Sequence, residues 1–312
     1  MYIAQAFKGD NVSWKFWITT LVCGGIFIIN FISYLLTSPE DMEAAYEMLK
    51  SIPKILGLIL NLIPFVVLLI FLIVFVVFMH KRSFLSLTTS RSKIDFKRIL
   101  FSFLLISVLT IGGFVYSYYS TPGEVVWNFE PGKFTVLVIV SLILFPFQIG
   151  FEEYFFRGYL MQQIGVAVKN KWFPLIFTSV LFGVAHSANP EVAEMGYITM
   201  VFYIGTGLLL GIMTLMDEGL ELALGFHLGN NLLAALLVTS EWSALQTDAM
   251  FKYVNEQATD AMVNEMLASV AISYPIIIII LAFTYKWKNW GDKLFGKVVM
   301  PVEQVTENGI GK

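Results

Sequence analysis

The stretch FEEYFFRGYL, residues 151–160, places three charged side chains inside a long apolar run. That run extends from about residue 134 to about residue 166, which is long enough for a membrane-spanning helix. Charged side chains are costly at membrane depth, and they are rare there unless they face a bundle interior or a water-filled cavity. The stretch therefore predicts that Glu152, Glu153 and Arg157 belong to a polar site inside a membrane domain.

The composition of the whole chain also indicates a membrane protein. Of its 312 residues, 57% are hydrophobic and 14% are charged, and the mean hydropathy is +0.74. A soluble domain could not keep such a surface hydrated. The sequence contains no basic region suited to nucleic acid, and the single Cys23 excludes an internal disulfide and a thiol cluster for zinc.

Eight apolar segments have nearly the length of a membrane span or more. They cover residues 14–36, 54–80, 98–119, 134–166, 172–188, 195–216, 219–239 and 266–286. Open backbone groups cannot be satisfied by lipid, and no segment shows the alternation typical of a β-barrel strand. We therefore expect an all-α polytopic membrane protein with about eight transmembrane helices.

Three regions are expected along this membrane domain. Residues 1–133 would form three N-terminal spans, and residues 134–240 a core of four spans. Residues 241–312 would form an outer interfacial segment, the last span and a cytosolic tail.

The distribution of positive charge predicts the orientation. Of the 20 Lys and Arg residues, 15 fall on the side of the two termini and four on the other, and the remaining one is Arg157. By the positive-inside rule, both termini of this multi-pass cell-membrane protein are cytosolic. Lys outnumbers Arg by 16 to 4, and Ile and Phe are abundant, which indicates a bacterial source.

Local patterns give further expectations about the helices. Residues 40–52 and 241–257 are expected to form helices at the outer membrane interface. The second of these would carry on one face Trp242, Leu245 and Met250. Gly207 and Gly211, in the sixth segment, suit close packing against another helix.

The charges of the fourth segment divide into a pair and a single carboxylate. Glu153 and Arg157 are four residues apart with the acid first, which favours an ion pair on one helix face. Glu152 is rotated by about 100° from Glu153 around the helix. Glu152 is therefore not neutralised by Arg157 and is available as a general base. Carboxylates in apolar surroundings can act in this way near neutral pH.

Two further segments carry histidines at membrane depth. His186 lies in the fifth segment, with Phe182 one turn before it. In the seventh segment, His227 and Asn231 are four residues apart, so both side chains point to the same side of a helix. We expect the three segments to meet in a cavity that opens towards the cytosol.

Three motifs in order resemble those of a known family. EExxxR at Glu152, Glu153 and Arg157, FxxxH at Phe182 and His186, and HxxxN at His227 and Asn231 resemble the CPBP family of intramembrane proteases. That family includes CAAX prenyl endopeptidases of the Rce1 type and bacterial Abi proteins linked to bacteriocin processing and self-immunity. The resemblance covers about residues 134–240 and implies hydrolysis of a peptide bond in or near the membrane.

The resemblance also implies a role for each motif residue. Glu152 would activate a water molecule with the assistance of His186, while His227 and Asn231 would polarise the scissile carbonyl and stabilise the oxyanion. Three supporting residues complete this set: Arg157 would hold Glu153, and Phe182 would shape the cavity wall or only pack in the core.

The cofactor and the substrate follow less directly from the sequence. Zn²⁺ bound by Glu152, His186 and His227 is one interpretation. We favour a mechanism without an obligatory metal, because Asn231 is a poor zinc ligand but a good oxyanion donor and no HExxH helix is present. The expected partners are the lipid bilayer and a membrane peptide or protein as substrate, with no nucleic acid.

Two other classes of function compete with a protease. The chain would be a non-catalytic immunity or scaffold protein if it kept the fold without the chemistry, but none of its motif residues is lost. A transporter would use the buried charges as a proton relay. Transporters of this kind often contain repeated halves with broken helices, and the sequence shows no such repeat.

Overall fold

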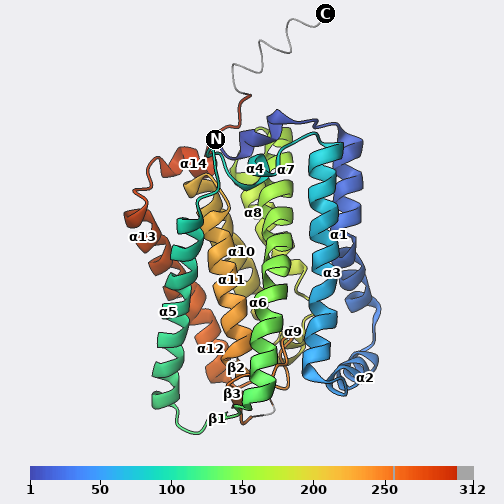
Figure 1. Cartoon of the computed structure of the whole chain (residues 1–312), viewed down its shortest axis with the longest axis vertical. Helices are drawn as coiled ribbons and strands as arrows, with labels where there is room; N and C mark the ends of the chain where they lie inside the picture. Colours follow the sequence, from blue (N-terminus) through green and yellow to red (C-terminus); the bar gives the residue numbers. More distant parts are fainter. Residues whose placement is uncertain (256, 301–312) are drawn as a thin grey trace, which may run out of the picture.

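The computed structural model describes residues 1–255 and 257–300, and it consists mainly of helices in one bundle (Figure 1). This confirms the all-α membrane fold. The first half contains η1 (Ile3–Lys8), α1 (Ser13–Leu36), α2 (Pro39–Lys50), α3 (Lys54–Val74), η2 (Phe75–Met79), α4 (Phe84–Thr88), α5 (Phe96–Ser120) and β1 (Val125–Trp127). The second half contains α6 (Pro131–Glu153), η3 (Tyr154–Leu160), α7 (Met161–Val168), α8 (Trp172–Val184), α9 (Pro190–Met195), α10 (Thr199–Asp217), α11 (Glu221–Leu236), β2 (Val238–Thr239), β3 (Phe251–Tyr253), α12 (Asp260–Ala268), η4 (Ser269–Ser273), α13 (Tyr274–Thr284) and α14 (Trp290–Phe295).

All eight expected segments are helical, but they differ in length. In the described part of the chain, six helices are long and apolar enough to cross a membrane: Ser13–Leu36, Lys54–Met79, Phe96–Ser120, Pro131–Val168, Thr199–Asp217 and Met262–Thr284. The other two, α8 with 13 residues and α11 with 16, are shorter than a span normally requires. A turn that leads to Pro190 follows α8, and the short strand β2 follows α11, so each helix ends early.

The two short helices lie among the long ones. Helix α11 packs against α5, α6 and α10, and α8 packs against α10. The contact between α8 and α10 is close: a Cβ atom added at Gly207 would lie 2.8 Å from the carbonyl oxygen of Ser179. Glycine is needed there because any side chain would push the two backbones apart. The expected packing role of Gly207 is confirmed.

The two interfacial segments have different outcomes. The first is helical, as α2. The prediction of a helix over residues 241–257 is wrong. Residues 251–253 form the central strand of a small sheet with the order β1-β3-β2. Glu256 lies outside the described residues. Strand β3 pairs antiparallel with β1 and parallel with β2. The ring of Phe251 packs between those of Phe114 and Trp127, so contacts with distant residues outweigh the local helical pattern.

The sheet closes one end of the bundle, and the N-terminus lies at the other end with α14 (Figure 1). The expected cytosolic tail falls partly on residues 301–312, which lie outside the described residues. The cytosolic placement of the termini and the division into three regions stay predictions.

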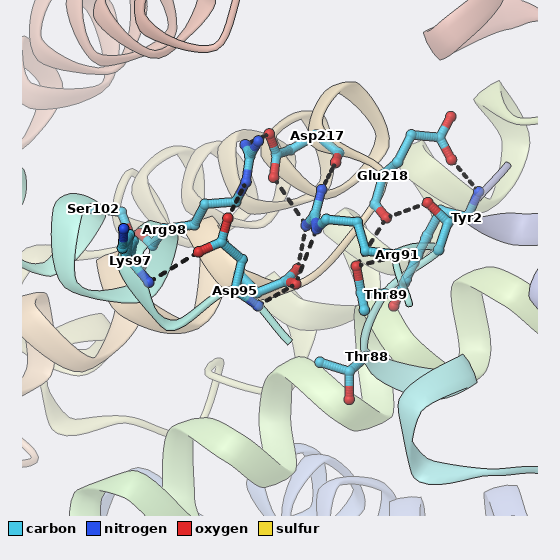
Figure 2. Close-up of polar contacts among 12 residues, drawn as sticks. Tyr2, Thr88, Thr89, Arg91, Asp95, Lys97, Arg98, Ser102, Asp217 and Glu218 are labelled. Carbon is cyan, nitrogen blue, oxygen red and sulfur yellow. Dashed lines mark hydrogen bonds and ion pairs between the residues drawn. The ribbon is translucent and has the colours of Figure 1, made fainter. Parts of the chain in front are cut away.

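A network of ion pairs joins α5, α10 and α11 near the end of the bundle where the N-terminus lies (Figure 2). Arg91 lies 3.2 Å from Asp217 and also pairs with Glu221. Arg98 contacts the second oxygen of Asp217, and the backbone N–H of Asp95 donates to Glu221 at 3.2 Å. The side chains of Asp217 and Glu221 are almost fully buried, so both carboxylates depend on these partners.

The substitution Arg91→Gln should lower the free energy of unfolding by about 2–3 kcal/mol, because it leaves buried carboxylates without a cation. This loss of stability is smaller than the largest losses seen when one partner of a buried ion pair is removed, because Arg98 still pairs with Asp217. Denaturant titration in detergent, followed by tryptophan fluorescence, measures it. The control Lys133→Gln breaks an exposed pair with Glu130 and should cost less than about 1 kcal/mol. Equal losses in the two variants would contradict this role of the network.

Candidate active site

The EExxxR motif lies where the longest helical segment changes its hydrogen-bond pattern. Glu152 and Glu153 end α6, and Arg157 lies in η3, a π-helical stretch. Such stretches are rare inside longer helices and are often found at functional sites. The expected ion pair is confirmed: Nη1 of Arg157 donates to Oε1 of Glu153 at 2.9 Å, and both side chains are fully buried.

A chain of polar contacts joins α6 to α11. Nδ2 of Asn231 donates to Oε1 of Gln148 at 3.0 Å, and Nε2 of Gln148 donates to Oε1 of Glu152 at 2.6 Å. The other oxygen of Glu152 lies 3.6 Å from Nε2 of His227. Nδ1 of His227 lies 2.8 Å from Oε1 of Glu153. The structure thus brings five of the motif residues into one connected group: Glu152, Glu153, Arg157, His227 and the partly buried Asn231.

The contact with Glu153 determines which ring nitrogen of His227 faces Glu152. A carboxylate paired with Arg157 acts as an acceptor, so Nδ1 of His227 carries the proton in this contact. Nε2 is then directed at Oε2 of Glu152, an atom that is buried and has no hydrogen-bond partner within the described residues. Across 3.6 Å the two atoms are too far apart for a direct hydrogen bond, but a water molecule between them can donate to both.

His186 lies close enough to Glu152 and His227 for an electrostatic interaction with both. It follows the end of α8, its Nδ1 lies 2.7 Å from the carbonyl oxygen of Phe182, and its ring stacks on Tyr203 at 4.5 Å. Within residues 1–255 and 257–300, it forms no hydrogen bond or ion pair with Glu152, His227 or Asn231. Because Nδ1 donates to a carbonyl, Nε2 is the free acceptor of this ring.

Phe182 lies between the two histidines. Its ring centre is 4.6 Å from that of His186 and 6.0 Å from that of His227, and the guanidinium of Arg157 lies 4.3 Å above it. Phe182 is buried and makes a cation–π contact with Arg157. The structure therefore places this residue in the wall of the site.

Sequence reasoning missed Gln148. Its side chain connects Asn231 to Glu152 and fixes one oxygen of the carboxylate. The signal was present, because Gln148 is a polar residue four positions before Glu152 in an apolar helix and so lies on the same face.

The donor set does not fit the expected zinc site. Within the described residues, no three His, Cys, Asp or Glu side chains are grouped so that they could hold a metal ion. Glu152 and His227 could supply two donors, but the expected third, His186, is not grouped with them in this way.

The cavities near the site lie at the sheet end of the bundle. One of about 410 Å³ is lined by Asn230, the neighbour of Asn231, and one of about 280 Å³ is lined by Tyr203, which stacks on His186. Residues of the sheet line both cavities. The sequence led us to expect a cavity that opens towards the cytosol, and these two cavities lie at the end of the bundle opposite the N-terminus (Figure 1).

Comparisons with known proteins concern the same part of the chain. Residues 132–233 match the family model described as "Type II CAAX prenyl endopeptidase Rce1-like". The chain is also similar to the uncharacterized protein YyaK of Bacillus subtilis (strain 168), with 28% identity over 242 residues, which cover 75% of this chain and 81% of that protein. No solved structure matches the chain.

Proposed function

We propose that the chain is an intramembrane endopeptidase, because residues 132–233 match the Rce1-like family model. The observation that carries the proposal is the position of Glu152. One of its oxygens is fixed by Gln148, and the other is buried without a hydrogen-bond partner and faces Nε2 of His227. A water molecule bound between Glu152 and His227 would be ready to attack a peptide carbonyl.

The reaction follows from this arrangement. Glu152 takes a proton from the water as its oxygen attacks the carbonyl carbon, and a tetrahedral oxyanion forms. Asn231 donates a hydrogen bond to that oxyanion, and Nε2 of His227 donates a second one when the ring binds substrate with a proton on each nitrogen, a charge that Glu153 balances through Nδ1. Glu152 then returns the proton to the leaving nitrogen as the C–N bond breaks, which gives one carboxylic acid and one amine.

The remaining motif residues hold the reacting groups. Glu153 orients His227 through Nδ1, and Arg157 neutralises Glu153, as in other sites where a buried carboxylate positions a histidine. His186 lies beside Phe182 and close to Glu152, so we assign it to binding the substrate or water from that side. The substrate is a membrane-associated peptide or protein, because the reacting groups lie in a bundle of membrane-length helices.

A peptide library tests the proposal. The purified chain is reconstituted in phospholipid vesicles with synthetic apolar peptides, and the products are identified by mass spectrometry. We expect pairs of fragments whose summed mass exceeds that of the parent peptide by one water. Vesicles without protein are the control. Intact peptides under all conditions, or peptides that only cross the vesicle membrane, would contradict a protease and favour the non-catalytic or transport alternatives.

Removal of metal should leave the cleavage rate unchanged within about twofold, because the proposed mechanism uses only side chains of the chain itself. Rates are compared before and after dialysis against a strong chelator, and bound metal is measured by elemental analysis. A known zinc protease treated in parallel shows that the chelator works. Stoichiometric zinc, with activity lost on chelation and restored by Zn²⁺, would show that the metal is required.

A further inference from the structure

The two cavities near the candidate active site form one groove. The larger is about 410 Å³ and the smaller about 280 Å³, and four lining residues are common to both: Glu191, Trp242, Tyr253 and Glu265. We call this combined space the sheet-end groove. It lies between α5, α9, α11, α12 and the sheet, at the end of the bundle opposite the N-terminus (Figure 1).

The groove borders the candidate active site at two points. Asn230 lines it and donates to Asn231 at 3.1 Å. Tyr203 lines it from the other side, and its ring stacks on that of His186. A peptide segment in the groove would therefore lie next to both outer members of the site.

Acidic and aromatic side chains give the groove its chemical character. Its carboxylates are Glu191, Glu265 and Glu124, and no Lys or Arg lies among its described lining residues. None of the three carboxylates forms an ion pair within the described residues. Glu265 accepts a hydrogen bond from the hydroxyl of Ser117, and Glu124 accepts one from the hydroxyl of Thr121.

Glu191 is the carboxylate that most needs a partner. Its Oε2 is buried without a hydrogen-bond partner in the described structure, and the indole N–H of the neighbouring Trp242 is likewise unsatisfied. Burial raises the pKa of the Glu191 carboxyl, because the charged form loses its hydration, and hydrogen bonds from the backbone N–H groups of Glu191 and Ala244 offset only part of this rise. A cation placed beside Glu191 would offset that loss, and the faces of Trp242 and Tyr253 attract cations as well.

We propose that the sheet-end groove binds a lysine or arginine side chain of the substrate and so selects peptides with a cationic residue near the cleaved bond. This inference rests on the proposed function. Opposite charge in a partly dehydrated groove favours the cationic peptide, and an anionic side chain in the same place would face three carboxylates.

Peptide binding tests the inference without cleavage. The full chain is reconstituted in zwitterionic phosphatidylcholine vesicles with a fluorescein-labelled Leu/Ala peptide that carries one lysine near its end. The matched peptide has norleucine at that position. We expect the lysine peptide to bind about tenfold more tightly, which corresponds to one favourable charge contact of about 1.4 kcal/mol. Equal binding of the two peptides to the wild-type protein would overturn the inference.

Two variants locate the effect in the groove. Glu191→Gln should reduce the tenfold preference to less than about threefold, because the neutral amide no longer attracts the cation. The control Glu194→Gln lies on the same helix but lines a different cavity, and it should keep the preference. Should Glu191→Gln fold poorly, Glu265→Lys changes an exposed rim position and should favour a peptide with glutamate over one with lysine. An unchanged preference in both groove variants would overturn the inference.

Peptide binding and peptide cleavage test the groove and the protease activity separately. Glu152→Gln should keep the preference for the lysine peptide, because Glu152 does not line the groove. If the preference is present but no peptide is cleaved by the wild-type protein, the proposed protease activity is wrong and the cation site remains. If peptides are cleaved without any preference, only the inference about the groove is wrong.

Discussion

Replacing Glu152 by glutamine should lower peptide turnover by about 10²–10⁴-fold while the protein stays folded. The amide oxygen can still accept the hydrogen bond from Gln148, so the local structure is kept. The amide cannot take a proton from water, so the attacking nucleophile is not formed. Initial rates in vesicles measure the loss, and thermal unfolding in detergent verifies the fold.

The matched control for Glu152→Gln is Glu130→Gln. Glu130 precedes the same helix, α6, but is exposed and pairs with Lys133 at the bundle end. The substitution Glu130→Gln makes the same chemical change outside the site. Turnover should stay within about twofold of the wild-type rate, as expected for a surface position. If Glu152→Gln and Glu130→Gln have equal turnover, Glu152 is not the general base.

Replacing Glu153 by glutamine should act mainly on stability, with a loss of about 3–5 kcal/mol in the free energy of unfolding. Arg157 is fully buried, and its only other hydrogen bond in the described structure goes to the carbonyl oxygen of Gly207 at 3.3 Å. The variant therefore leaves a buried cation without its counter-ion. Denaturant titration in detergent measures the loss.

A double variant separates the stranded charge from other effects of Glu153→Gln. In Glu153→Gln/Arg157→Met the buried cation is removed along with its partner, so much of the lost stability should return. The single variant Arg157→Met leaves the Glu153 carboxylate in contact with His227. Its free energy of unfolding should lie between those of Glu153→Gln and the double variant. Wild-type stability in Glu153→Gln would show that the ion pair does not hold this segment.

Much of the site could be predicted because its residues follow helical spacing. The four-residue interval between Glu153 and Arg157 was sufficient to predict their ion pair, which the structure contains. The same interval placed His227 and Asn231 on one face of α11, and both make contacts with side chains of α6. The all-α membrane fold followed from the apolar segments, since lipid permits few alternatives.

The features that could not be predicted depend on contacts between distant parts of the chain. Strand β3 forms because its backbone pairs with β1 and β2. The sequence of residues 241–257 alone does not indicate which distant segments will pair with it. The π-helical stretch at Arg157 leaves the residue spacing unchanged and has no clear mark in the composition. The position of His186 just past the end of α8 depends on where that helix ends, and the early end of this helix was not apparent from its apolar run.

The central claim is that Glu152 activates water to hydrolyse a peptide bond within the membrane. The most direct test is cleavage of a library peptide by the reconstituted protein in ¹⁸O-labelled water, with the new C-terminus analysed by mass spectrometry. The account predicts one ¹⁸O atom in the carboxyl group formed by the wild-type protein and almost no product with Glu152→Gln. Labelled product formed at equal rates by both proteins, or no cleavage by the wild type, would contradict it.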